Sequence, residues 1–306
     1  MIRHFGYACI NSTLSSLPKD KKVTTNRTLR MSNFSLERCY QLVLDNCRDL
    51  RKILSWNKNN NILYFRISSS LLPFKDHPIL GYSLENSPKG REALFHLKKA
   101  GEFAKENSMK LELHPGPFNC LASKKPNVIK NTISHLEMNS YIADCLGYDT
   151  EMKINIHVGS LNDNDFDSTA KRFIQNYHLL SDNCKKRLTL ENDDNPRMWT
   201  VDKLYEYICS KVNIPIVLDY HHWMLSNEGG SIYDSANIAF STWDCRDTIT
   251  THYSESRDDK NLAAHSDYIE NYIEDLSSTI TYDVMLECKK KELALLKYAR
   301  TNSLQS

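Results

Sequence analysis

The chain has 306 residues, of which 41% are hydrophobic and 10% aromatic, and its formal net charge is +1. This composition can fill a folded core, which excludes an intrinsically disordered chain. The charge is not that of a strongly basic nucleic-acid-binding protein, although basic charge on one face or bound divalent ions would still allow DNA binding.

No stretch approaches the ~20 consecutive apolar residues that a membrane-spanning helix needs. The first residues have no apolar signal-peptide core and enter an expected strand at once. Nine cysteines occur without a Cys-x-x-Cys pair, which favours reduced thiols. We therefore expect an intracellular protein, in the cytoplasm or in a DNA-containing compartment such as the nucleus.

Short apolar runs that are typical of buried parallel strands alternate with segments of helical periodicity. The expected strands are residues 2–8, 62–67, 110–114, 153–157, 188–191, 215–219, 248–252 and 283–287. The expected helices are residues 35–57, 88–107, 127–146, 167–182, 200–212, 232–240, 267–277 and 289–300. Eight strand–helix units predict a closed (β/α)8 TIM barrel, a single domain over residues 1–300 with a tail at 301–306. An open doubly wound sheet is disfavoured because no glycine-rich phosphate-binding motif follows the first strand.

A histidine or an acidic residue ends six of the expected strands. These residues are His114, His157, Glu191, Asp219, His252 and Glu287. The carboxyl ends of barrel strands meet at one mouth, so we expect these side chains to converge there. His222 and His265 lie just beyond strand ends; His222 is preferred over its neighbour His221 because it lies three residues after Asp219.

Imidazoles mixed with carboxylates are typical ligands of Zn²⁺ or Mn²⁺. Eight ligands are too many for one ion, so the pattern predicts two or three ions bridged by a carboxylate such as Glu191. Each residue alone has an ordinary explanation, such as a hydrogen-bonded loop histidine or a helix cap at Asp219. Their joint occurrence at six strand ends favours the metal centre.

Several motifs in this order resemble those of the UV damage endonucleases, (β/α)8-barrel enzymes related in fold to endonuclease IV. The resemblance runs nearly end to end. Its motifs lie at residues 5–7, 24–30, 114–116, 157–159, 190–193, 219–222 and 286–289.

The resemblance implies a metal-dependent nick in damaged double-stranded DNA, immediately 5′ to cyclobutane pyrimidine dimers and 6-4 photoproducts, made by a metal-activated hydroxide. Manganese is the usual ion, with Zn²⁺ or Mg²⁺ as alternatives. By resemblance, His114, His157 and Glu191 hold one ion. Glu191, Asp219, His252 and Glu287 hold a second, and His222 and His265 a third. Glu191, His252 and Glu287 are the expected catalytic residues.

The resemblance also implies that residues in the first and third strand–helix loops probe the lesion while the DNA is bent. The expected DNA or lesion contacts are Tyr7, Asn11, Asn26, Arg27, Pro117 and Phe118. Tyr7 and Phe118 are equally compatible with packing roles. Basic loop residues that could meet phosphates are Lys21, Lys22, Arg27, Arg30, Lys124 and Lys125.

Two positions depart from the family's pattern. Pro117 and Phe118 stand where the family has Gln and Tyr, which leaves an aromatic wedge without its hydrogen-bonding groups. Thr250 stands where many members have a lysine that is carboxylated near the metals. The first departure predicts an altered lesion range, and the second predicts an altered affinity for a third ion or an altered pH dependence of that affinity.

Three alternatives remain from the residues. The first is a metal-dependent sugar isomerase or epimerase on a related barrel, the second an abasic-site endonuclease, and the third a non-catalytic protein that binds damaged DNA. No feature of the sequence indicates a protein partner or a membrane.

Overall fold

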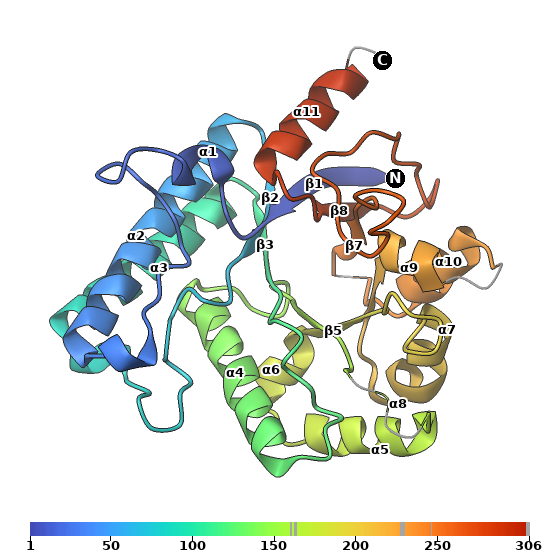
Figure 1. Cartoon of the computed structure of the whole chain (residues 1–306), viewed down its shortest axis with the longest axis horizontal. Coiled ribbons are helices and arrows are strands. Elements are labelled where there is room, and N and C mark those ends of the chain that lie inside the picture. Colours follow the sequence, from blue (N-terminus) through green and yellow to red (C-terminus); the bar gives the residue numbers. More distant parts are fainter. Residues whose placement is uncertain (160, 162–163, 227–229, 246, 304–306) are drawn as a thin grey trace.

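Eight parallel strands close into a barrel in sequence order, with β1 paired to both β2 and β8. The computed structural model of the chain describes residues 1–159, 161, 164–226, 230–245 and 247–303. The strands are β1 (Ile2–Ala8), β2 (Tyr64–Ile67), β3 (Lys110–Leu113), β4 (Ile154–Ile156), β5 (Leu188–Glu191), β6 (Ile216–Asp219), β7 (Ile249–Tyr253) and β8 (Tyr282–Leu286). This architecture confirms the predicted (β/α)8 barrel (Figure 1).

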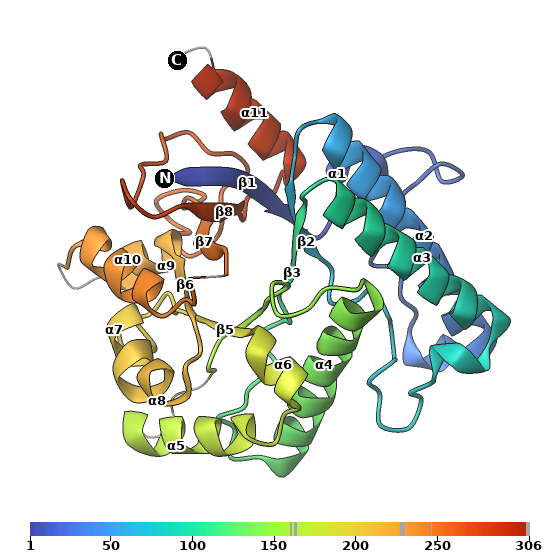
Figure 2. The same cartoon turned by 180° about the vertical axis from the view of Figure 1, so that it is seen from behind.

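Helices surround the barrel in both views (Figures 1 and 2). The longer ones are α2 (Leu36–Asn59), α3 (Pro88–Glu106), α4 (Pro126–Cys145), α5 (Phe166–Tyr177), α10 (Ile232–Ser241) and α11 (Glu292–Ser303). The shorter ones are α1 (Ser12–Ser15), α6 (Asp182–Arg187), α7 (Val201–Leu204), α8 (Ser210–Val212) and α9 (Tyr220–Ser226). Single turns are η1 (Met31–Asn33), η2 (Leu84–Asn86) and the π-helical η3 (Tyr205–Cys209). None of these described helices is long and apolar enough to cross a membrane.

Local sequence explains why the principal helices begin where they do. The Ser35 hydroxyl accepts a hydrogen bond from the Arg38 backbone N–H and caps α2, which satisfies one of the N–H groups that a helix start leaves without a partner. Pro88 opens α3, where its missing N–H costs nothing. The buried stripe of α2, which includes Val43, Leu50 and Ile53, packs into the hydrophobic core.

Apart from residues 2–5 of β1, which are partly exposed, the strand residues are almost all buried, and every residue of β2, β5 and β6 is. Side chains alternate between the barrel interior and the helix layer. On β1, a Cβ at Gly6 would meet the Tyr64 ring within 2.6 Å, so the interior is filled from β2 at this level. The next residue, Tyr7, faces outward and packs against Phe65, with ring centroids 5.0 Å apart.

One predicted helix is wrong. Residues 267–277 form an irregular segment, although their polar and apolar pattern favours a helix. Side chains from elsewhere take the backbone N–H groups that a helix would pair internally. The carboxylate of Glu255 accepts from Glu270 and Asn271, and the hydroxyls of Tyr298 and Tyr282 accept from Ile273 and Leu276.

Other boundaries differ by smaller amounts. The helix expected over residues 167–182 ends at Tyr177, and a separate α6 leads into β5. An unpredicted helix, α9, follows β6 without a loop. β3, β4 and β8 each end one residue before the expected ligand, so His114, His157 and Glu287 begin the loops at the mouth.

Candidate metal centre at the barrel mouth

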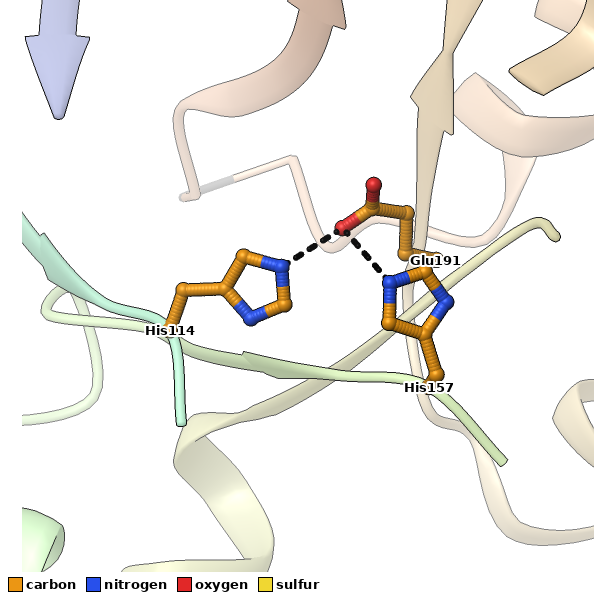
Figure 3. Close-up of side chains that lie close together, drawn as sticks. All are labelled: His114, His157 and Glu191. Carbon is orange, nitrogen blue, oxygen red and sulfur yellow. Dashed lines mark ion pairs between the residues drawn. The ribbon is translucent and has the colours of Figure 1, made fainter. Parts of the chain in front are cut away.

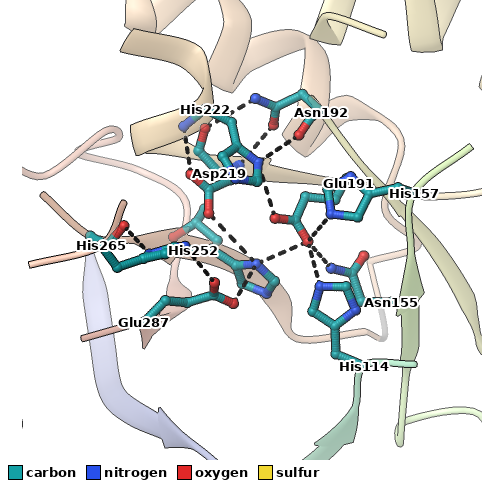
Figure 4. A network of polar contacts seen from close by, with 12 residues as sticks. His114, Asn155, His157, Glu191, Asn192, Asp219, His222, His252, His265 and Glu287 are labelled. Atoms are coloured by element: carbon teal, nitrogen blue, oxygen red, sulfur yellow. Dashed lines mark hydrogen bonds and ion pairs between the residues drawn. The ribbon is translucent and has the colours of Figure 1, made fainter. Parts of the chain in front are cut away.

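Glu191 lies at the centre of the residues that the sequence predicts as ligands (Figure 4). One of its oxygens, Oε2, is 3.1 Å from His114 Nε2, 3.8 Å from His157 Nε2 and 3.1 Å from His252 Nδ1. Figure 3 shows the rings of His114 and His157 directed at this same oxygen. The other oxygen, Oε1, is 3.4 Å from His222 Nδ1.

The remaining predicted ligands complete the cluster. Asp219 Oδ2 is 3.9 Å from His252 Nδ1, and Glu287 Oε1 is 3.4 Å from the same nitrogen. His265 Nε2 is 3.9 Å from Glu287 Oε2. The structure therefore brings all eight residues to one rim, although they come from three strands (β5, β6 and β7), from helix α9 and from the loops after β3, β4, β7 and β8.

The donor atoms fit divalent cations. Three groups could each hold an ion: His114, His157 and Glu191; Glu191, Asp219 and His222; and His114, His252 and Glu287. Among the described residues, Glu191 Oε1 and Asp219 Oδ2 are buried without a hydrogen-bond donor. A buried carboxylate oxygen without a partner is costly, and a bound cation would remove that cost.

Neighbouring groups orient the imidazoles. The Asp193 carboxylate accepts a hydrogen bond from His157 Nδ1 at 2.9 Å, and the Asn192 carbonyl accepts one from His222 Nδ1 at 2.9 Å. His265 Nδ1 lies 2.7 Å from the Ser254 hydroxyl. With Nδ1 engaged, Nε2 of each ring is left for a ligand, as is usual for metal-binding histidines.

Glu191 is itself held in place. Asn155 donates its side-chain N–H to Glu191 Oε2, and Thr189 in turn donates to Asn155 Oδ1 at 2.9 Å. Asn155 comes from β4 and Thr189 from β5, so the two strands fix the carboxylate jointly.

The centre has strongly perturbed titration behaviour. Burial opposes the protonation of His157, but Glu191 and Asp193 outweigh it and raise its pKa to about 9. Burial is likewise outweighed at His222, where Asp219 and Glu191 raise the pKa to about 10. Burial works against ionisation of Glu191, yet His252 and His157 hold its pKa well below the ordinary value. The carboxylate is therefore ionised and able to bind a cation.

Sequence reasoning missed Arg66 and Glu112, which lie directly beneath the candidate ligands. Arg66 on β2 is 4% exposed, and one of its guanidinium nitrogens lies 2.7 Å from His252 Nε2. It also pairs with Glu287 and, at 2.7 Å, with Glu112 Oε1. The signal was present: Glu112 precedes His114 by two residues and thus shares its face of the strand, and Arg66 interrupts an apolar strand.

The residues expected to touch DNA fall into two groups. Phe118 is 90% exposed in the loop after β3, beside the exposed Pro117. Tyr7 and Asn11 are buried; the Tyr7 hydroxyl donates to Asn57 Oδ1 at 2.7 Å and accepts from the Asn11 amide at 2.9 Å. Both side chains are thus enclosed by the fold, and their expected lesion contacts stay predictions.

The basic loop after β1 is partly committed to the fold. Arg27 pairs with Asp49 at 2.6 Å and donates to the Thr24 carbonyl. Asn26 is exposed. The other basic residues expected to face phosphates are also exposed: Lys21, Lys22, Arg30, Lys124 and Lys125.

Thr250 is buried inside the barrel below His252. Its hydroxyl accepts a hydrogen bond from the Lys110 amine at 2.5 Å. The amine also lies 4.9 Å above the Tyr64 ring and 3.3 Å from Asp283. Thr250 therefore contacts a lysine on β3 instead of contributing to the candidate ligand groups.

Comparison with known proteins places this geometry in a family. The UV-endonuclease UvdE family model matches residues 3–306. The UV-damage endonuclease of Schizosaccharomyces pombe is 33% identical over 98% of this chain and 51% of its own length, so this chain spans about half of that protein. The UV DNA damage endonuclease of Bacillus cereus is 30% identical over 97% of this chain and 93% of its own length.

Solved structures support the same family and the same barrel fold. The crystal structure of SacUVDE matches with a TM-score of 0.85 and 30% identity, covering 99% of this chain and 98% of that one. Endonuclease IV from Thermus thermophilus matches with a TM-score of 0.57 and 11% identity, covering 82% and 93%, which shows a shared fold alone. The D-psicose 3-epimerase of Clostridium cellulolyticum, at a TM-score of 0.54 and 16% identity over 78% and 80%, likewise shares the fold. The end-to-end family match and the two endonuclease relatives show that this chain belongs to the UV-endonuclease UvdE family.

Proposed function

We propose that the chain is a divalent-metal-dependent DNA repair endonuclease that nicks the backbone of double-stranded DNA at UV damage. The observation that carries the proposal is the buried Glu191 carboxylate, on which four imidazoles from four different segments converge. A centre of this kind, in a chain of the UV-endonuclease family, supports phosphodiester hydrolysis.

His114, His157 and Glu191 would hold one ion, and Glu191, Asp219 and His222 another. Glu287, His252 and His265 line the remaining side. Divalent ions bound there would supply activated water and stabilise the charge that develops on the phosphate. The protein's own contribution is to fix the ligands: Asn155 holds Glu191, and Asp193 keeps Nε2 of His157 turned toward the centre.

We propose further that the nick falls immediately 5′ to cyclobutane pyrimidine dimers and 6-4 photoproducts, and that Mn²⁺ is the working ion. The support is the resemblance of the mouth motifs and the mixed imidazole and carboxylate donors. We propose that the ring of Phe118, which is exposed next to Pro117 in the loop after β3, stacks in a gap at the lesion. A photodimer weakens stacking, which makes local distortion of the duplex less costly there.

A nicking assay on UV-irradiated and untreated plasmid, with and without Mn²⁺, tests the proposal. The parent protein should nick only the irradiated plasmid and only with metal. Glu191→Gln should lower the rate by at least about 100-fold, because it removes the shared anionic ligand. Glu151→Gln, an exposed substitution outside the centre, is the matched control and should retain the parent rate.

An end-labelled duplex with one photodimer locates the cut, and a second duplex with an abasic site tests that alternative substrate. A folded, Mn²⁺-bound parent protein that leaves the irradiated plasmid intact would rule out the proposal. A cut on the 3′ side would rule out only the proposed polarity.

A further inference from the structure

We propose that Arg66 is a resident cation of this centre, fixed from below by Glu112, and that it weakens divalent-ion binding at His252 and Glu287. Ions would then bind in two steps, first at the groups centred on Glu191 and last at His252 and Glu287. This inference rests on the metal centre of the proposed function.

The guanidinium of Arg66 contacts two residues of one candidate ligand group. It pairs with Glu287 Oε1 and donates to His252 Nε2 at 2.7 Å. That group, formed by His114, His252 and Glu287, thus already contains a fixed positive charge. Arginine keeps its charge at any pH at which proteins are folded, so the charge is permanent.

Glu112 holds Arg66 in this position. Glu112 is 2% exposed, and its two oxygens have separate partners: Arg66 Nε at 2.7 Å and the Tyr64 hydroxyl. Both carboxylate oxygens are therefore occupied, and Glu112 is an anchor for Arg66 instead of an available ligand. With both charges almost completely buried, water and salt screen them little.

In the described part of the chain, the two candidate ligand groups that contain Glu191 have no such fixed positive charge paired with their carboxylates. Among the described residues, no lysine or arginine forms an ion pair with Glu191 or Asp219, and each has a buried oxygen without a hydrogen-bond donor. Glu287 Oε1, by contrast, is already paired with Arg66. An incoming dication therefore meets Glu191 beside imidazoles, which can release a proton as the ion binds, and Glu287 beside a guanidinium, which cannot.

The hydrogen bond from Arg66 to His252 also favours late ion binding at His252. A guanidinium only donates, so His252 Nε2 accepts, and the hydrogen of a neutral imidazole is then on Nδ1. Nδ1 is the atom that faces Glu191 and Glu287, at 3.1 and 3.4 Å. An ion at Nδ1 thus requires the contact between Arg66 and His252 to rearrange.

Titration of the metal-free protein with Mn²⁺, with free Mn²⁺ followed by electron paramagnetic resonance, tests the inference without reference to activity. The parent protein should show two classes of site whose affinities differ by at least about tenfold, from one partly screened unit charge near the weaker site. Arg66→Gln combined with Glu112→Gln should bring the two classes together. The double variant removes both charges, so neither is left buried and unpaired.

Arg3→Gln is the matched control, because Arg3 also pairs with a buried carboxylate, Asp283, outside the candidate ligand groups. It should keep the two classes of the parent. A single affinity class in the parent, or a gap that is unchanged in the double variant, would overturn the inference. Absence of any Mn²⁺ binding would instead overturn the metal centre itself, whereas loss of nicking with two intact classes would concern only the proposed function.

Thermal unfolding gives a second readout that also checks folding. Removing Arg66 alone, as Arg66→Gln, should lower the melting temperature of the metal-free protein more than that of the Mn²⁺-loaded protein, because the ion replaces the lost positive charge. Equal losses in the two forms would contradict the role of Arg66 as a resident cation. If Arg66→Gln does not fold, the Mn²⁺ titration of the parent protein remains the test, and a single affinity class there would overturn the inference.

Discussion

At the scale of single residues, the centre depends on which atom of each side chain faces inward. His157 has two nitrogens, and only the bond from Nδ1 to Asp193 leaves Nε2 directed at Glu191. We therefore expect Asp193 to act as a positioning residue through its hydrogen bond to His157. Its neighbour Asp194 is exposed and outside the candidate ligand groups.

Asp193→Ala should weaken Mn²⁺ binding by about 10- to 100-fold, because His157 loses the partner that fixes its ring. Asp194→Ala should bind Mn²⁺ like the parent. Titration monitored by electron paramagnetic resonance measures both. Equal affinities in the two variants would show that His157 is oriented by other contacts.

Phe118 is the exposed aromatic residue at the mouth whose role is most readily separated from folding. Because 90% of its surface is exposed, Phe118→Ala should change the free energy of unfolding by less than about 0.5 kcal/mol. Loss of base stacking should weaken binding to a photodimer duplex by about tenfold, from ~1–3 kcal/mol per stacked base. Phe95→Ala, at a ring that is 54% exposed on α3, should leave binding unchanged in the same fluorescence anisotropy assay.

At the scale of elements, the loops at the mouth are fastened to neighbouring helices by a few polar contacts. Asp76, in the loop after β2, lies 2.6 Å from His135 Nδ1 on α4. Burial works against ionisation of Asp76, but the bond from His135 outweighs it, and the pKa of Asp76 is lowered. This contact ties the loop after β2 to the helix after β3.

The sign of the pH effect follows from that lowered pKa. The contribution of Asp76 is complete above its unfolded pKa, ~4, and is lost as the pH falls through the lower folded value. Asp76→Asn should therefore cost about 1 kcal/mol at pH 7, and the difference from the parent should shrink as the pH falls below ~4. Urea unfolding of both proteins across this range measures it; a difference that is constant with pH would contradict the ionic contribution.

At the scale of the whole molecule, the closed barrel brings the carboxyl ends of its strands to one rim. The candidate metal ligands lie at or just after those strand ends. Endonuclease IV and a sugar epimerase share this fold at low identity, so the barrel alone does not specify the reaction. Candidate ligands from opposite sides of the barrel, such as His114 after β3 and His252 on β7, meet around Glu191. An ion bound there would link these two sides of the barrel and should stabilise the barrel as a whole.

Metal removal should therefore lower the melting temperature. At a free Mn²⁺ concentration of about 100 times the dissociation constant, binding to the folded state alone contributes ~2.7 kcal/mol. For a chain of this length that corresponds to a loss of about 4 °C when a chelator removes the ion. Calorimetry with and without the chelator measures it, and Glu191→Gln should show a smaller loss. Identical melting temperatures for the parent in both conditions would argue against a metal site of this strength.

Much of the barrel and of its rim could be predicted from the residues. Buried parallel strands appear as short apolar runs whatever surrounds them, and a polar residue at the end of such a run, such as Glu191, must face the mouth. The features that could not be predicted from the residues have a common cause. The segment 267–277 and the side chain of Tyr7 are decided by distant partners, such as Glu255 and Asn57.

The order of strands and the convergence of acids and imidazoles at their ends were determined by the sequence itself, because both follow from local patterns and from the parallel arrangement that those patterns impose. Only the tertiary structure decided that Arg66 lies between Glu112 and Glu287. An ion pair forms between whichever charges the closed barrel brings within a few ångströms. That proximity joins residues as far apart as 66 and 287 in the chain, which no local pattern records.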